Sequence, residues 1–172
     1  MTNLSVLVAH SQPHSALRDA AVDAAGALAA DAHLSTTPDV IDLAAFGQAL
    51  LDPTPNGPVA DAVDTVLRSE IIVVASPFAH GTYTGLLKVF LDRLPELALG
   101  HAVVVPVAAV PDLRNGHGVE EDLRLVFSDL GAWVAEPGLL LSESELGDPA
   151  GVVRAWAAVA APALNEALAV GA

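Results

Sequence analysis

Histidine, serine and glycine residues gather in three loops of this chain, and each loop follows an apolar segment. The loops span residues 10–15, 76–85 and 108–118. Serine hydroxyls and backbone N–H groups at the start of a helix can hold a phosphate. Glycine lets a flat ligand approach the main chain, because no side chain stands in the way. These residue types therefore favour the binding of a flat ligand and of a phosphate group.

The second loop carries the most informative pattern. Residues 70–75 form an apolar run rich in β-branched side chains, which predicts a buried strand. After a turn with Pro77, Gly81 and Gly85, apolar residues repeat at helical spacing: Leu87, Phe90, Leu91 and Leu94. Such a strand–turn–helix unit places backbone N–H groups at the carboxyl edge of a parallel sheet. Open α/β sheets bind their ligands at that edge.

Strand and helix patterns alternate along the chain. Strands are predicted over residues 4–9, 39–43, 70–75, 101–108 and 133–141, and helices over 15–32, 59–68, 84–94, 119–130 and 148–170. The proline-rich segment 44–58 predicts a loop, and Pro162 predicts a kink or break in the last helix. Strict alternation indicates a parallel sheet covered by helices on both faces.

Five such strands suit the flavodoxin-like order 2-1-3-4-5, with a ligand crevice where strands 1 and 3 diverge. We therefore expect a flavodoxin-like three-layer α/β sandwich with a five-stranded parallel sheet, formed by residues 1–172 as a single domain. The six-stranded dinucleotide-binding order is disfavoured, because only five strands are predicted and no G-x-G-x-x-G follows the first one.

Composition narrows the classes of partner. The formal net charge is −14, so the surface repels phosphate backbones and nucleic-acid binding is not expected. Cysteine is absent, which excludes disulfides, a thiolate nucleophile and a cysteine-based zinc site. No apolar run is long enough to span a bilayer, and residues 1–5 lack the basic start of a secretory signal. These features predict a cytoplasmic protein without membrane association.

The turn and helix after residue 76 match the pattern of a known family. The matching residues are Pro77, His80, Gly81, Thr82, Tyr83, Thr84, Gly85, Leu87, Lys88 and Asp92. They resemble the core motif of the NADPH-dependent FMN reductases, which are flavodoxin-like enzymes that reduce flavin with a nicotinamide. His80 stands where the family has Asn, and Ala79 where it usually has Tyr. The resemblance implies an NAD(P)H:flavin oxidoreductase with FMN and NAD(P)H as cofactors.

The resemblance also implies binding roles for the three loops. Phosphate would be held by the first loop, through Ser11, His14 and Ser15. The isoalloxazine ring would lie against the second loop, through Pro77, Phe78, Ala79, His80, Gly81 and Thr82. Backbone N–H groups of residues 78–81 would stabilise the reduced ring. The third loop would close the other side of the ring, through Ala108, Ala109 and Val110, where the family often has glycines. No side-chain acid or base is demanded by hydride transfer.

The same resemblance implies a partner protein and self-assembly. The protein would supply reduced flavin to a separate monooxygenase, and it would form a homodimer or homotetramer. The apolar face of the helix after the motif would serve as the interface, through Leu87, Phe90, Leu91 and Leu94.

Other interpretations remain open from the residues. Ser15 could be an N-cap and the second loop an ordinary turn. Metal could be bound by loop histidines with Asp112 or Glu120: His10, His14, His80 and His117. A serine hydrolase is disfavoured, because neither Ser11 nor Ser76 lies in a G-x-S-x-G elbow. An FMN-holding electron carrier and a flavin-free interaction domain also fit the predicted fold.

Overall fold

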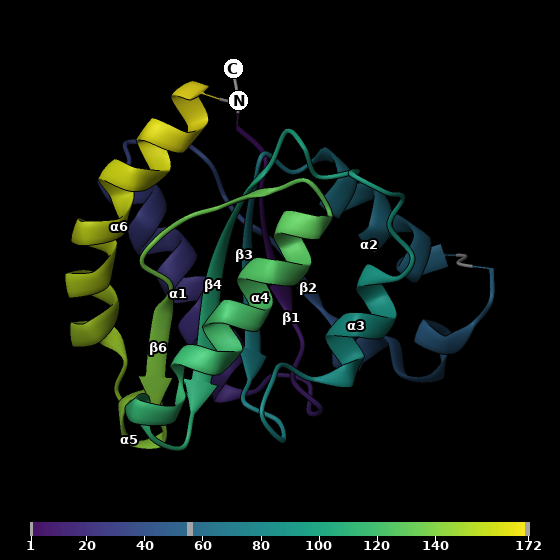
Figure 1. Ribbon diagram of the computed structural model, residues 1–172, viewed down its shortest axis with the longest axis horizontal. Coiled ribbons are helices and arrows are strands. Elements are labelled where there is room, and N and C mark those ends of the chain that lie inside the picture. Colours follow the sequence, from purple (N-terminus) through teal and green to yellow (C-terminus); the bar gives the residue numbers. More distant parts are fainter. Residues whose placement is uncertain (1, 55–56, 171–172) are drawn as a thin grey trace.

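A parallel sheet forms the centre of the molecule (Figure 1). The computed structural model describes residues 2–54 and 57–170. Its strands are β1 (Leu4–Val8), β2 (Asp39–Asp42), β3 (Ile71–Pro77), β4 (Val103–Val110), β5 (Trp133–Val134) and β6 (Leu139–Ser142). They run in the order β2-β1-β3-β4-β5, β6 also pairs with β4, and every pair is parallel. The predicted flavodoxin-like order is therefore confirmed.

Helices cover both faces of this sheet (Figure 1). On one face α1 (Ala16–Asp31) and α6 (Ala150–Val170) pack against each other and on the sheet. On the other face lie α2 (Gly57–Arg68), α3 (Gly85–Leu91) and α4 (His117–Asp129). Short elements complete the described chain: the 3₁₀ helices η1 (Leu43–Leu51) and η2 (Leu113–Asn115), and the helix α5 (Glu143–Leu146).

The core has two layers because the strand side chains alternate between the two faces. In β3, Val73 belongs to the cluster under α1 and α6, and Val74 belongs to the cluster under α2, α3 and α4. The helices α1 and α6 bury mainly alanine against one another, so their backbones can approach closely. This packing on both faces fixes the ends of the strands, and the loops begin at these ends.

The segment predicted as a loop over residues 44–58 is partly helical, and that prediction is wrong. The helix η1 is capped by Asp42, whose carboxylate accepts the Ala44 N–H at 3.2 Å. Leu43 and Leu50 are buried, so the segment contributes to the core rather than running over the surface. Pro58 lies in the first turn of α2, where a missing N–H costs little. Pro55 and Asn56 lie outside the described residues.

Of the kink or break predicted at Pro162, the break does not occur, because α6 continues from Ala150 to Val170. Pro162 is exposed, so the carbonyl that loses its N–H partner can bind water instead. Buried residues on both sides of it, Ala161 and Leu164, hold the helix against α1 and the sheet.

The strand predicted over residues 133–141 is divided into β5 and β6, so the sheet has six strands rather than five. Val104 of β4 pairs with Val134, and Val107 pairs with Leu139. Pro106 lies between these two positions and has no N–H to donate to a neighbouring strand. The partner strand is therefore interrupted where β4 cannot bond to it.

Side chains of α4 hold the interrupted segment. Glu120 Oε1 accepts the Gly138 N–H at 2.9 Å, and Arg124 Nη1 donates to the Val134 carbonyl at 3.0 Å. Arg124 also pairs with Glu136 at 3.2 Å. These contacts satisfy backbone polar groups at the edge of the sheet and in the segment between β5 and β6.

No helix within residues 2–54 and 57–170 combines the length and the apolar character needed to cross a membrane.

Candidate functional site

The three predicted loops meet at the carboxyl ends of β1, β3 and β4, which is the lower edge of the sheet in Figure 1. They surround a cavity of about 330 Å³. Its lining from these loops comprises His10, Gln12, Ser15, Ala16, Leu17, Pro77, Phe78, Ala109, Val110 and Pro111. This is the expected crevice for a parallel sheet whose strand order reverses between β1 and β3.

A second cavity of about 320 Å³ lies at the opposite edge of the sheet. It is lined by His101, Trp133 and residues near the end of α6. The cavity at the carboxyl edge is the candidate site, because the three loops and the start of α1 meet there.

Ser15 is the N-cap of α1, as the structural interpretation of this residue predicted. Its Oγ accepts the Arg18 N–H at 3.2 Å, which leaves the hydroxyl hydrogen available to a ligand. Ala16 and Leu17 line the cavity, and backbone N–H groups in a first helical turn have no intrahelical acceptor. Capping and phosphate binding are therefore compatible at this position.

Arg18 does not supply a cation to this cavity. Its Nη1 donates to Asp19 Oδ1 at 2.9 Å, and its Nε lies 4.0 Å from Asp42 Oδ2. The guanidinium is therefore turned toward acidic side chains.

The other predicted phosphate residues, Ser11 and His14, are exposed and do not line the cavity. The His14 N–H donates to Asp42 Oδ2 at 3.1 Å, and its φ of 55° places it in the left-handed region. His10 does line the cavity, and the Gln12 N–H donates to its Nδ1 at 3.0 Å. The same Nδ1 lies 3.2 Å from the Gln12 carbonyl oxygen, so both contacts hold the ring against Gln12.

The second loop folds into a small hairpin turn. The Ala79 N–H donates to the Thr82 carbonyl at 2.7 Å, and the Thr82 N–H donates back to the Ala79 carbonyl at 3.2 Å. His80 and Gly81 lie between them with φ of 50° and 101°. Positive φ at both central residues is the pattern of a type I′ turn, which favours Asn-Gly in sequence.

The expectation that all four N–H groups of residues 78–81 face a ligand is wrong for two of them. The Phe78 N–H donates to the Ala109 carbonyl at 2.8 Å, and the Ala79 N–H is used within the hairpin. Pro77 and Phe78 line the cavity, whereas Ala79, His80, Gly81 and Thr82 lie beside it. The loop is therefore chiefly a rigid wall.

Two hydroxyls that sequence reasoning missed join the first loop to the second. The Thr84 N–H donates to Ser76 Oγ at 3.1 Å, and Thr84 Oγ1 donates to the Ala9 carbonyl at 2.8 Å. Ser76 is fully buried at the end of β3, and Thr84 is the residue before α3. These bonds tie the end of β1 to the start of α3 across the crevice.

The third predicted group is still part of β4, which extends to Val110 rather than ending at Ala108. Ala108 is completely buried in the core layer under α4 and does not reach the cavity. Ala109 and Val110 do line it, together with Pro111. One of the three predicted residues, Ala108, therefore does not line the cavity.

Glu143 and Leu146 of α5 form a further wall of the cavity that sequence reasoning missed. The helix α5 begins with a capping box, in which Ser142 Oγ accepts the Glu145 N–H and Glu145 accepts the Ser142 N–H at 2.8 Å. These hydrogen bonds from Ser142 lower the pKa of Glu145. The signal was present in the sequence as Ser-x-x-Glu at residues 142–145.

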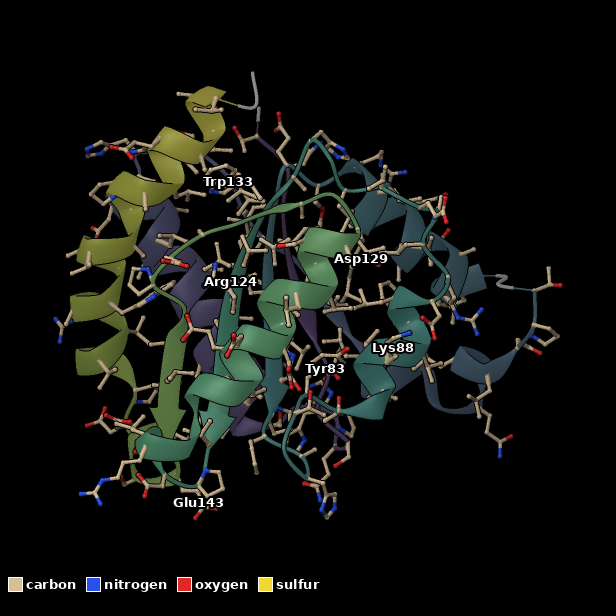
Figure 2. All side chains as sticks on the ribbon, viewed as in Figure 1. Tyr83, Lys88, Arg124, Asp129, Trp133 and Glu143 are labelled. Carbon is tan, nitrogen blue, oxygen red and sulfur yellow. The ribbon has the colours of Figure 1, made fainter. Side chains whose placement is uncertain are left out.

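The motif residues Tyr83 and Lys88 do not line the cavity. Figure 2 shows Lys88 on α3 and Tyr83 beside α4. Burial raises the pKa of Tyr83, and Asp122 and Asp92 add to the effect while Lys88 opposes it. Lys88 forms an exposed ion pair with Asp92, and this hydrogen bond raises the pKa of Lys88.

The apolar face proposed for oligomerisation lies inside the molecule, so that prediction is wrong. The residues concerned are buried in the core under α3: Leu87, Phe90, Leu91 and Leu94. Their spacing indicated an apolar helical face, but the face packs on the sheet of its own chain.

The metal interpretation gains no support. Over residues 2–54 and 57–170, no three His, Asp or Glu side chains are grouped so that they could hold a metal ion. The side chain of His117 lies outside the described part of the chain.

Comparison with known proteins identifies the family. The family model for NADPH-dependent FMN reductase matches residues 2–145. The chain belongs to this family. The "FMN reductase (NADPH)" of Pseudomonas putida strain KT2440 is 31% identical over 81 residues, which is 47% of this chain and 41% of that protein. The "NADH-dependent FMN reductase SfnE" of Pseudomonas putida is 28% identical over 120 residues, or 67% of this chain and 64% of that protein.

Solved structures share the fold of this family member. An oxidoreductase from Corynebacterium diphtheriae superposes with a TM-score of 0.86 at 23% identity, covering 99% of this chain and 98% of that one. The apo form of an NADH:FMN oxidoreductase gives 0.80 at 20% identity, covering 96% and 89%. At these identities the likeness shows the flavodoxin-like fold alone.

Proposed function

We propose that the protein is an NAD(P)H-dependent FMN reductase that binds flavin in the cavity at the carboxyl edge of the sheet. The observation that supports it most is the convergence of the three loops on one crevice in a chain of this family. The matched segments cover less than two thirds of the curated relatives, so the activity of the whole protein is a proposal.

The cavity walls fit a flat aromatic ring on one side and a phosphate on the other. Pro77, Phe78 and Ala109 supply apolar surface at the carboxyl ends of β3 and β4. Ser15 and the free N–H groups at the start of α1 supply neutral donors, and the helix dipole favours an anion there. The chain thus offers an apolar surface for the ring and hydrogen-bond donors for the phosphate. The side-chain donor at the start of α1 is the Ser15 hydroxyl, and none of the described residues that line the cavity is lysine or arginine.

The role of the protein in such a reaction is to bind and orient. Bound flavin would supply an acceptor for the hydride that the nicotinamide donates. The hairpin at residues 79–82 and the Ser76–Thr84–Ala9 bonds hold the ring wall in place, because their polar groups bond within the protein. Fixed walls lower the entropic barrier of bringing two rings together.

Oxidation of NADH and of NADPH at 340 nm, with and without added FMN, tests the proposal beside a flavin-binding titration. We expect turnover that depends on FMN. Tight flavin binding without NAD(P)H oxidation would favour an electron carrier instead. No turnover and no flavin binding in a folded sample would favour a flavin-free interaction domain and overturn the proposal.

Three further properties belong to the same proposal. The reduced flavin would leave for a partner monooxygenase, the enzyme would act in the cytoplasm, and it would assemble as a homodimer or homotetramer. The core position of the α3 apolar face leaves the outer surface near Tyr83 and the exposed Leu125 of α4 as the interface to test. Sedimentation of the wild type and of Leu125→Glu measures this assembly.

A further inference from the structure

The charges around the candidate cavity differ from those expected of a strong phosphate site. Among the described residues that line it, none is lysine or arginine. Arg18 is paired with Asp19 and Asp42, and Lys88 with Asp92 on the outer side of α3. The lining does include one acidic residue, Glu143 at the start of α5, and this residue is exposed. Figure 2 shows Glu143 at the lower left edge of the molecule, at α5.

The size of the cavity limits how far this carboxylate can lie from a bound anion. A compact cavity of about 330 Å³ is about 9 Å across, so Glu143 lies within about one Debye length of any anion held inside. Repulsion between a carboxylate and a phosphate dianion is therefore only partly screened at physiological salt. It opposes the attraction from the start of α1.

Among the described residues of the lining, the groups that could donate to a phosphate include no lysine or arginine. They are the Ser15 hydroxyl, the first N–H groups of α1 and the ring of His10, which contacts Gln12 through Nδ1. Hydrogen bonds from neutral donors are weaker than those from guanidinium or ammonium groups. The carboxylate of Glu143 therefore opposes a phosphate that no lysine or arginine of the described lining attracts.

We propose that Glu143 determines the flavin specificity of this site by weakening its hold on the 5′-phosphate, so that riboflavin is accepted about as well as FMN. The inference rests on the proposed function. A site of this kind releases its flavin readily, which suits a reductase whose product is used elsewhere. The apolar walls then carry most of the affinity, because they contact the ring common to both flavins.

Fluorescence titrations with FMN and riboflavin on the wild type, Glu143→Gln and Glu143→Lys test the inference. We expect the two Kd values of the wild type to agree within about threefold, and FMN affinity to rise by about three- to tenfold in Glu143→Gln. Glu143→Lys should raise it further, while riboflavin affinity stays constant along the series.

Glu96→Gln and Glu96→Lys are matched controls. Glu96 is exposed in the segment before β4, at the opposite edge of the sheet, so these variants change the net charge equally without touching the cavity. They should leave both Kd values unchanged. Equal gains for both flavins in the Glu143 series, or an unchanged FMN affinity, would overturn the inference alone. Failure of folded wild type to bind either flavin would overturn the proposed function as well.

Discussion

The loop after β1 leaves the Ser15 hydroxyl hydrogen available to a ligand, whereas the loop after β3 uses its first N–H groups within the protein. Ser15 accepts one N–H and keeps its own hydrogen free, and Ala16 and Leu17 in the first turn of α1 line the cavity. In the second loop, the Phe78 and Ala79 N–H groups are used by Ala109 and Thr82. The first loop is suited to binding and the second to shaping the wall. The family motif therefore marks mainly a structural turn beside the site.

Severing the link between the two loops should have the largest effect. Thr84→Val removes the hydroxyl that donates to the Ala9 carbonyl at 2.8 Å and keeps the volume of the side chain. The free energy of unfolding should fall by about 1–3 kcal/mol, because a partly buried acceptor loses its partner. Urea denaturation measures this change.

Thr65→Val is the matched control for that substitution. The Thr65 hydroxyl donates to the Asp61 carbonyl within α2, where the bond is exposed to water. Its loss should change the stability by less than about 0.5 kcal/mol. Equal losses for the two variants would show that the Thr84 hydroxyl does not hold the loops together.

Two glycines of the second loop separate backbone strain from crowding. A Cβ would meet no atom within 4 Å at either Gly81 or Gly85, but only Gly81 has a positive φ, of 101°. Gly81→Ala should therefore lower the free energy of unfolding by about 1–2 kcal/mol. Gly85→Ala, at the start of α3, should leave stability unchanged or raise it by about 0.4–1 kcal/mol. Thermal and urea unfolding measure both variants. Equal changes in the free energy of unfolding for Gly81→Ala and Gly85→Ala would refute the turn assignment.

Substitutions of Ser15 separate its capping role from its contact with phosphate. Ser15→Ala should destabilise the protein by about 1 kcal/mol through loss of the cap, and it should weaken FMN binding by about three- to tenfold while sparing riboflavin. Ser15→Asp can still cap α1 but places a second carboxylate at the cavity. It should keep the stability and lose more FMN affinity than Ser15→Ala. Parallel losses of FMN and riboflavin binding would place the phosphate elsewhere.

The smallest effect concerns the motif residue outside the cavity. Tyr83 is the only tyrosine of the chain, so absorbance near 295 nm reports its ionisation directly. Because burial raises its pKa above 10.0, the neutral phenol is favoured in the folded state. This contribution to stability is present below pH 10 and falls as the pH rises through the folded pKa. Added FMN should leave the titration unchanged, since Tyr83 does not line the cavity. A measured pKa of Tyr83 at or below the ordinary tyrosine value would contradict the half-buried position of its side chain.

Capping signals and proline positions explain most differences between the expected and the observed elements. Asp42 begins η1 inside a segment whose prolines suggested only loop. Pro162 remains in α6 because alanines and Leu164 pack on either side of it. Pro106, by contrast, coincides with the interruption between β5 and β6. The effect of a proline therefore depends on where its missing N–H would have pointed.

The sequence by itself determined the strand order, the two helix layers and the edge of the sheet at which the three predicted loops meet. Those properties follow from the period of the apolar residues and from the strict alternation of strands and helices. The His80–Gly81 turn was likewise visible, because a positive φ at two successive positions demands particular residues.

Only the tertiary structure decided which side chains face the cavity. Ala108 and Ala109 are neighbours of identical type, yet one is buried under α4 and the other lines the site. Glu143 reaches the same cavity from α5, far along the chain from the first loop. Direction along a strand and contact between distant segments depend on packing, which local composition does not encode. The charge of the site, and with it the expected flavin preference, is therefore a property of the folded molecule.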